Sequence, residues 1–419
     1  RELHEYTQIL PARFYEPGSH LENRKIAFGL KSTDERLFLS WVMLRSKASD
    51  FDFSTIPDLK SQWDKFALRR DGITKRSILY FAQHYAPKEY EEVKKTTIQF
   101  YVDESIKTKS DYDLAVVLYQ MFKDKYLCSS IVHKKFWVFR NHRWVLDEGN
   151  TLRMALSSDV HAVYQTIIDT LPLELNKFTG EERDLKTKKL VECIDIIRKN
   201  LKMAQHKNNI MREAMELFYD KDFIRRMDSN KFLMCFKNGV VDFKNKTFRP
   251  GYAHDYITKS THISLPDLST FDSNEDFKKI IEEINYFMYT LFPKETLRQY
   301  MWDHLASCLI GYKKEHVFNI YRGSGSNGKS ILTDLMSQTL GEYKGTVPIT
   351  LVTDKRNSIG GTSSEVVALK GIRYAVMQEP SKDAVINEGV MKELTGGDPI
   401  QARALYCDSE IFEPQFNLV

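Results

Sequence analysis

The stretch Gly323-Ser-Gly-Ser-Asn-Gly-Lys329-Ser330 decides how its part of the chain folds. It matches the phosphate-binding pattern in which two glycines separated by four residues precede lysine and serine or threonine. The residues before it, Val317-Phe-Asn-Ile-Tyr321, are apolar and β-prone, so they predict a strand. The residues after it, 331–340, have helical spacing without Gly or Pro, and Gly341 stands where a helix would end. A glycine loop between a strand and a helix is the setting in which this pattern binds a nucleotide.

Each residue type in this loop has a chemical role. Backbone N–H groups of a glycine-rich loop can point at phosphate oxygens, and the helix N-terminus adds donors and a favourable dipole. Lys329 would reach the β- and γ-phosphates, and the Ser330 hydroxyl would hold Mg²⁺. A chance Gly/Ser turn is the alternative, but the flanking patterns disfavour it. ATP and Mg²⁺ are therefore expected at Gly323, Ser324, Gly325, Ser326, Asn327, Gly328, Lys329 and Ser330.

Length and composition indicate a multidomain globular protein. The 419 residues allow two to four domains, and 42% hydrophobic and 28% charged residues are ordinary for a soluble protein. A net charge of +4 is only mildly basic, so a nucleic-acid surface has to be a local patch or arise by assembly. The five cysteines form no C-x-x-C pair, which indicates a reducing compartment and no zinc site. No apolar run is long enough to span a membrane, and the chain begins with Arg1, so a piece of a longer protein is expected.

The pattern along the chain predicts three segments. Residues 1–95 carry helical stretches with aromatic anchors such as Trp41 and Trp63, and they predict a mainly helical module. Residues 108–290 mix helix and strand patterns, which predicts an α+β domain. Residues 291–419 contain the phosphate loop within an α/β alternation, which predicts a P-loop ATPase core.

The middle segment contains three local patterns. Residues 135–145 form two β-prone runs around Asn141-His142, which predicts a hairpin. Its aromatic residues, beside Arg140 and Arg143, could stack on bases, although such residues more often pack into a core. Residues 232–243 predict a strand, a turn and a strand. One face of a helix is predicted by the spacing of Leu190, Ile194, Ile197, Leu201 and Ala204.

Hydrolysis needs a second strand that brings a carboxylate near the γ-phosphate. The best candidate is Arg373-Tyr-Ala-Val-Met-Gln-Glu379, where strand-prone residues precede the acid and Pro380 ends the strand. Many phosphate-loop ATPases place Asp-Glu here, whereas this chain has Gln378-Glu379. Glu379 is therefore the candidate catalytic and Mg²⁺-binding carboxylate, and a strand end with a purely structural acid is the alternative.

A second candidate region follows at residues 390–406. Gly396-Gly397 allows a tight turn, and Asp398 can hydrogen-bond that turn. The residues that follow predict two short strands. A hairpin carrying Lys392 and Arg403 could track a nucleic-acid backbone, or Asp398 and Arg403 could only brace the loop. The residues alone leave both interpretations open.

Together these stretches resemble the ordered motifs of superfamily 3 helicases, in the poxvirus-type primase–helicase branch. The motifs are the phosphate loop, Val376-Met-Gln-Glu-Pro380, and the most specific one, Lys392-Glu-Leu-Thr-Gly-Gly-Asp-Pro-Ile-Gln-Ala-Arg-Ala-Leu-Tyr406. Upstream, Lys237-Asn-Gly-Val-Val-Asp-Phe243 with Tyr256-Ile-Thr258 resembles the domain before the helicase core of that branch. The first segment is weakly similar to the helical module that follows the primase. The pattern is similar to primase–helicases of nucleocytoplasmic large DNA viruses, asfarviruses among them.

The resemblance implies an AAA+ ATPase core that assembles into a hexameric ring and acts in DNA replication. ATP would be hydrolysed between subunits, with a neighbour's arginine contributing about 10³–10⁵ in rate. The ring would move along single-stranded DNA and unwind forked DNA. Lys392, Asp398 and Arg403 would engage DNA or couple it to hydrolysis. A primase domain would precede residue 1, and the protein would act without a membrane segment at viral replication sites in the host cytoplasm.

Two departures from the family pattern matter. The family has a further strand ending in an Asn that senses the γ-phosphate, and here that strand would begin at Asn417-Leu-Val419. The arginine finger would also lie beyond this point, so the core is expected to be truncated and not to hydrolyse ATP by itself. The Gln378 departure keeps a second function open, a nucleotide-dependent assembly or loading factor without unwinding activity. A small-molecule kinase is disfavoured because no arginine-rich lid is visible.

Overall fold

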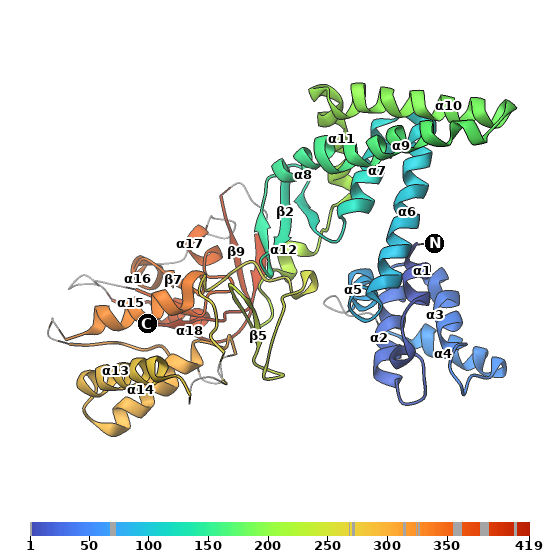
Figure 1. Cartoon of the computed structure of the whole chain (residues 1–419). Helices are drawn as coiled ribbons and strands as arrows, with labels where there is room; N and C mark the ends of the chain where they lie inside the picture. The colour runs from blue at the N-terminus through green and yellow to red at the C-terminus, as the bar shows by residue number, and fades with distance from the viewer. Residues whose placement is uncertain are drawn as a thin grey trace. The chain divides into compact units, whose positions relative to one another are not determined.

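The computed structural model describes residues 2–67, 73–267, 269, 273–312, 316–323, 325, 327–354, 363–377, 385–405 and 409–419. The described chain is mostly helical with small sheets (Figure 1). It separates into two compact units: unit 1 is Arg1–Val138 with Leu146–Lys221, and unit 2 is Phe139–Val145 with Asp222–Val419. Each unit has room for more than one domain, so the three segments expected from the sequence stay a prediction. None of the described helices combines the length and hydropathy that crossing a membrane requires.

Unit 1 begins with helices packed around aromatic side chains. Trp41 and Trp63 have ring centroids 5.8 Å apart in this core. The Trp41 indole N–H donates to Asn23 Oδ1 (2.9 Å), and that of Trp63 donates to Glu35 Oε2 (2.7 Å). Because each indole has an acceptor, two tryptophans can be buried without an orphaned donor. The helical character expected here is confirmed, in α1 (Glu2–Gln8), α2 (His20–Lys31), α3 (Phe38–Arg45), α4 (Ile56–Lys65), α5 (Lys75–Tyr85) and α6 (Pro87–Thr108).

The second half of unit 1 is a helical layer with two π-helical segments, Leu156–Val160 and Ile196–Leu201. The helix face predicted around residues 190–204 is only partly right. A π-helical turn is wider than an α-helical one, so it shifts the buried face; Ile194 is 47% exposed, whereas Ile196 and Asn200 are buried. The α-helices of this layer are α7 (Asp111–Phe122), α8 (Asn150–Ala155), α9 (His161–Glu174), α10 (Gly180–Asp195) and α11 (Ala204–Leu217).

The predicted hairpin is confirmed. Strands β2 (Lys135–Arg140) and β3 (Arg143–Leu146) form a sheet in the order β1-β2-β3 with β1 (Tyr126–Ser130). Asn141 and His142 both have positive φ, 50° and 66°, as a two-residue type I′ turn requires. Phe136 and Trp144 are 2% and 1% exposed, so these rings pack into cores instead of facing a nucleic acid. The Trp144 indole N–H donates to the Ala253 carbonyl (2.7 Å) within unit 2.

Unit 2 opens with α12 (Phe223–Arg226) and a three-stranded antiparallel sheet. The strands are β4 (Leu233–Phe236), β5 (Gly239–Asp242) and β6 (Thr247–Arg249). The expected strand, turn and strand over 232–243 are therefore confirmed, with Lys237 and Asn238 forming the turn.

A parallel sheet lies in the last part of unit 2, in the order β11-β8-β7. Its strands are β7 (Lys344–Thr346), β8 (Tyr374–Val376) and β11 (Asn417–Leu418). The strand predicted at 317–321 is wrong as a regular strand. Asn319 contacts the edge of the sheet through its N–H, which donates to the Leu418 carbonyl (2.9 Å). A two-residue β11 offers too short an edge for a longer ladder.

Helices surround this sheet, and a second hairpin follows the last of them. The helices are α13 (Glu275–Leu291), α14 (Glu295–Ser307), α15 (Lys329–Leu340), α16 (Thr350–Thr353), α17 (Ser364–Val367) and α18 (Glu388–Thr395). The two short strands expected after the Gly-Gly turn are confirmed as an antiparallel pair. They are β9 (Ile400–Arg403) and β10 (Ser409–Phe412).

Arg373, directly before β8, joins the parallel sheet to the antiparallel one. It is 2% exposed, and its Nη2 donates to the carbonyls of Asn230 and Leu233, each at 3.2 Å. Burial lowers the pKa of this guanidinium to about 10. Gly311 provides the space, because a Cβ there would lie 1.3 Å from Arg373 Nη1. The connection between the β4-β5-β6 sheet and the β11-β8-β7 sheet therefore depends on Gly311, which belongs to neither sheet.

Gly311→Ala is expected to destabilise unit 2 by about 1–3 kcal/mol, since the new Cβ would displace a buried guanidinium that donates to two carbonyls. The measurement is the free energy of unfolding by urea, followed by circular dichroism. Gly389→Ala is the control, because its Cβ would meet its nearest neighbour, Asn387 Oδ1, at 3.3 Å. Equal stability of the two variants would contradict the close packing described for Arg373.

Candidate functional site

The predicted phosphate loop leads directly into α15. Gly325 and Gly328 have φ of 95° and 78°, a left-handed backbone that glycine adopts without a Cβ penalty. Gly328 is the N-cap of α15, so Lys329 and Ser330 occupy the first helical turn. Backbone N–H groups in a first turn have no acceptor within the helix and can bind an anion. The predicted helix after the loop is thus confirmed, and its N-terminal end lies at the loop.

The loop folds closely on itself around Lys329. Its Nζ donates to Asn327 Oδ1 at 2.8 Å, so the amine lies against the loop in an exposed position. A Cβ at Gly323 would lie 1.6 Å from Asn327 Nδ2 and 2.8 Å from Lys329 Nζ. A Cβ at Gly328 would lie 2.7 Å from Leu291 Cδ1. Glycine at position 328 is therefore favoured by its left-handed backbone, and at both positions a Cβ would displace a neighbouring side chain.

Three predicted site residues lie outside the described part of the chain. They are Ser324, Ser326 and Glu379, together with the neighbouring Gln378. The ladder of β8 extends to Met377, whose N–H donates to the Val419 carbonyl (2.8 Å). Ligands of open α/β sheets bind beyond the carboxyl ends of the strands. Glu379 follows that end of β8 by sequence, and its role stays a prediction.

The second candidate region surrounds the β9–β10 hairpin. The Lys392 side chain, on α18, is 82% exposed and lies 3.9 Å from Glu388. Asp398 is exposed and follows Gly397, which has φ of 81°. Arg403 is braced through its backbone, because its N–H donates to Ser363 Oγ (3.1 Å) and its carbonyl accepts the Ser363 N–H (2.8 Å). These two hydrogen bonds fix the backbone of Arg403. Whether the side chains of Lys392, Asp398 and Arg403 contact DNA or only brace the loop stays open.

A buried histidine that sequence reasoning missed lies beside the approach to the loop. His304 is 7% exposed, and its Nε2 is 2.8 Å from the Tyr321 hydroxyl. Asn319 Nδ2 lies 3.3 Å from His304 Nδ1, and Asn319 Oδ1 accepts the Tyr300 hydroxyl (2.8 Å). Burial lowers the pKa of His304, which favours the neutral ring. The sequence signal was weak, because α14 carries several other polar residues, and His304 attaches this helix to residues 317–321.

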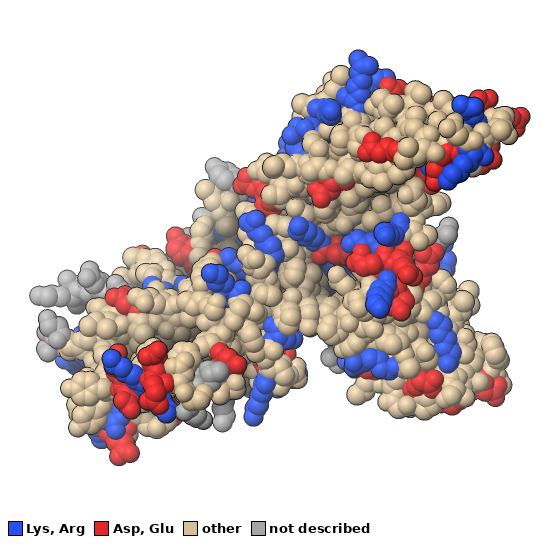
Figure 2. Space-filling model, in the orientation of Figure 1, with Lys and Arg blue, Asp and Glu red and all other residues tan. Residues whose placement is uncertain are grey.

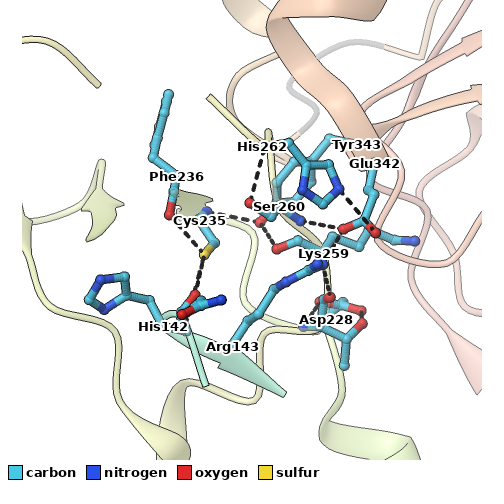
Figure 3. A network of polar contacts seen from close by, with 12 residues as sticks. His142, Arg143, Asp228, Cys235, Phe236, Lys259, Ser260, His262, Glu342 and Tyr343 are labelled. Carbon is cyan, nitrogen blue, oxygen red and sulfur yellow. Dashed lines mark hydrogen bonds and ion pairs between the residues drawn. The ribbon is translucent and has the colours of Figure 1, made fainter. Parts of the chain in front are cut away.

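The far end of α15 is held by a polar network (Figure 3). The Glu342 carboxylate accepts the Ser260 N–H (2.8 Å) and an ion pair from Arg143, at the hairpin tip. Its other oxygen lies 3.3 Å from His262 Nε2. Arg143 also donates to the Thr258 carbonyl (2.8 Å). One carboxylate therefore connects the phosphate-loop helix to two segments distant in sequence.

Tyr343 and Gly341 complete this attachment. The Tyr343 hydroxyl accepts the Cys235 N–H (2.9 Å) and donates to the Lys259 carbonyl (3.2 Å). Gly341 has φ of 54°, and a Cβ there would lie 2.5 Å from the Thr261 carbonyl oxygen. The helix that begins at the phosphate loop is thus anchored at its opposite end by close backbone packing and by charge.

A double-mutant cycle on Arg143→Ala and Glu342→Ala should give a coupling of about 1 kcal/mol in unfolding free energy. The value is modest because the Glu342 side chain is 42% exposed, although that of Arg143 is only 16% exposed. The matched control is Glu388→Ala with Lys392→Ala, whose side chains are 87% and 82% exposed. Additive losses at the first pair would show that it does not hold the helix end.

Comparison with known proteins finds that the chain is similar to proteins of large DNA viruses. Residues 115–285 match the family model described as D5 N terminal like. A mimivirus protein (Acanthamoeba polyphaga mimivirus) named "Putative helicase" is 33% identical over 394 residues, which is 92% of this chain and 39% of that protein. An African swine fever virus protein named "Putative primase" is 24% identical over 443 residues, covering 100% of this chain and 45% of that protein. A Frog virus 3 protein named "Putative helicase" is 23% identical, covering 84% and 45%.

The chain fits the D5-like primase–helicase family of nucleocytoplasmic large DNA viruses. The family model ends at residue 285, before the phosphate loop, so the role of the loop stays a prediction. The chain spans less than half the length of each of these D5-like relatives.

Proposed function

We propose that the chain is the helicase part of a D5-like primase–helicase, which hydrolyses ATP to move on single-stranded DNA and unwind duplex DNA. The observation that carries the proposal is the position of Lys329 at the start of α15. Its Nζ donates to Asn327, in a loop where Gly325 and Gly328 have positive φ. Lysine in this position contacts nucleotide phosphates. Support for DNA as the other partner comes from relatives named as helicases or primases.

In this proposal the loop binds the phosphates of ATP. Backbone N–H groups of the first turn of α15 would bind phosphate oxygens, and Lys329 would neutralise their charge. The residues fit Mg²⁺ as well, because Ser330 places an exposed hydroxyl beside the lysine. When bound, Mg²⁺ would offset charge on the β- and γ-phosphates, held by Ser330 and Glu379. Glu379 would also orient the attacking water.

Assembly is the second part of the proposal. In a hexameric ring of AAA+ type, a neighbouring subunit would supply the arginine that completes the site. The parallel order β11-β8-β7 supports a P-loop type of core, because the strand leading toward Glu379 lies centrally between its neighbours. A primase domain in the same polypeptide belongs to the proposal too, on the strength of the relatives' names and lengths.

ATP hydrolysis by the full-length protein, with and without single-stranded DNA, tests the proposal. Turnover is expected to rise with DNA, and Lys329→Ala is expected to abolish it through loss of phosphate binding. Glu379→Gln should reduce turnover by about 10²–10⁴-fold while ATP binding persists, since a water-orienting carboxylate is removed. Lys344→Ala is the matched lysine control, because Lys344 lies on β7 and contacts Thr346 Oγ1 (2.6 Å). ATP binding with turnover that DNA leaves unchanged would instead favour the assembly or loading factor.

A further inference from the structure

A run of the chain far in sequence from the phosphate loop is strongly basic. Residues 196–212 contain no Asp or Glu, and they include five Lys or Arg residues. The whole chain of 419 residues has a net charge of only +4, so this is a local concentration of charge. The five cations are Arg198, Lys199, Lys202, Lys207 and Arg212.

The fold turns most of these cations toward solvent. The π-helical segment Ile196–Leu201 and α11 bury their apolar residues, including Ile197, Leu201 and Ile210. Since these side chains occupy the inner face, the basic residues between them are left outside. Lys207 is half-buried, and the other four cations are exposed.

Hydrogen bonds within unit 1 bring Lys207 close to the π-helical segment and Arg153 close to α11. Lys207 Nζ donates to Ser157 Oγ (3.1 Å), and that hydroxyl donates to the Leu201 carbonyl (3.2 Å). Lys207 therefore lies beside the end of the π-helical segment. Arg153 Nε donates to Asn208 Oδ1 (3.2 Å), which adds a sixth cation on the same side of α11. Arg212 is one helical turn beyond Asn208 and shares its face.

Nearby carboxylates leave this surface, here called the basic surface, positive. Asp111 is turned inward, where it accepts the side-chain amides of Asn200 and Asn209, each at 3.0 Å, and also contacts His206. Asp195 lies 3.6 Å from Lys199, and the exposed Glu216 is one helical turn beyond Arg212, so these two carboxylates offset two of the six positive charges. In Figure 2, Lys and Arg side chains gather where Figure 1 shows α11 and the end of α10 beside it, whereas the other end of α10 carries charges of both signs.

The chemistry of the basic surface favours a polyphosphate backbone over a lipid surface. Ile210, Ala214 and Met215 of α11 are buried in unit 1, and the exposed apolar side chains nearby, Met154 and Met203, do not form a continuous face of that helix to insert into a bilayer. The Ser157 hydroxyl and the Asn208 amide lie among the cations, and such groups bind phosphate oxygens alongside Lys and Arg. Residues 196–212 contain no Phe, Tyr or Trp, so this stretch has no aromatic ring on which a base could stack.

We propose that the basic surface, formed by Arg153, Arg198, Lys199, Lys202, Lys207 and Arg212, binds the phosphate backbone of DNA without regard to base sequence. The choice of DNA rests on the proposed function. Binding here needs no nucleotide, because the surface shares no residue with the phosphate loop. It gives the protein a hold on DNA that is separate from the motor site.

The test is fluorescence anisotropy of a labelled random-sequence DNA, single-stranded and duplex, titrated with the full chain in the absence of nucleotide. The variant is the triple substitution Arg198→Gln, Lys202→Gln and Arg212→Gln. Affinity should fall at least tenfold at low salt. For duplex DNA, the slope of log affinity against log salt should become shallower by about 0.9 for each phosphate that the variant no longer neutralises.

A second triple variant has the same change in net charge: Arg183→Gln, Lys186→Gln and Lys188→Gln on α10, a helix that also carries Glu181, Glu182 and Asp184 near these residues. It should bind DNA like the unmodified chain. If both triple variants lose the same affinity for DNA, the loss reflects only the lower net charge, and the proposal is overturned. Unchanged affinity of the first variant would also overturn it. Matching thermal melts establish that neither variant is unfolded.

Two further arms separate this proposal from the proposed function. Lys329→Ala should keep its nucleotide-free affinity for DNA, whatever happens to its ATP turnover. If the chain binds DNA through the basic surface but never hydrolyses ATP, the proposed helicase function is wrong and the proposal for the basic surface stands. Binding of an acidic peptide or of anionic vesicles, with no binding of DNA, would show that the basic surface serves another partner and would overturn the proposal.

Discussion

The carboxylate of Glu342 is the contact on which the candidate nucleotide site depends. It lies at one end of α15, while the glycine loop lies at the other, so the helix is held in unit 2 from behind. Arg143 and Ser260 reach this carboxylate from positions 199 and 82 residues earlier in the chain. A loop of glycines cannot fix its own position, since glycine adds conformational freedom. The anchored helix provides the rigidity that the loop lacks.

Patterns of local chemistry were the predictable part of this fold. The glycines of the loop, the Asn141-His142 turn and the Gly-Gly turn each depend on backbone conformations that neighbouring residues specify, so sequence reasoning located them. The same holds for Trp41 and Trp63, whose burial follows from their size. The strand predicted at 317–321 failed for a non-local reason, because its formation depends on a partner edge and β11 is only two residues long. Periodicity around residue 194 failed because it assumes α-helical winding.

Interactions between distant residues were beyond sequence reasoning. Nothing in the neighbourhood of Gly311 indicates that a guanidinium 62 positions later needs its space, yet a Cβ there would meet Arg373 Nη1 at 1.3 Å. The same is true of His304, because the sequence of its helix does not indicate that Tyr321 and Asn319 contact its ring. Which distant polar residues form a pair depends on the tertiary fold and not on the residues near each of them in sequence. The candidate site was therefore predictable in its loop and not in its supports.

The π-helical segment Ile196–Leu201 has a consequence for how this chain can vary. Such a segment takes up one extra residue locally, so positions before and after it can keep their faces. The winding of α10 is also not passed on to α11, because the chain turns at Lys202 and Met203 before α11 begins at Ala204. A change of length by a single residue is therefore tolerated here more easily than in the regular part of α10.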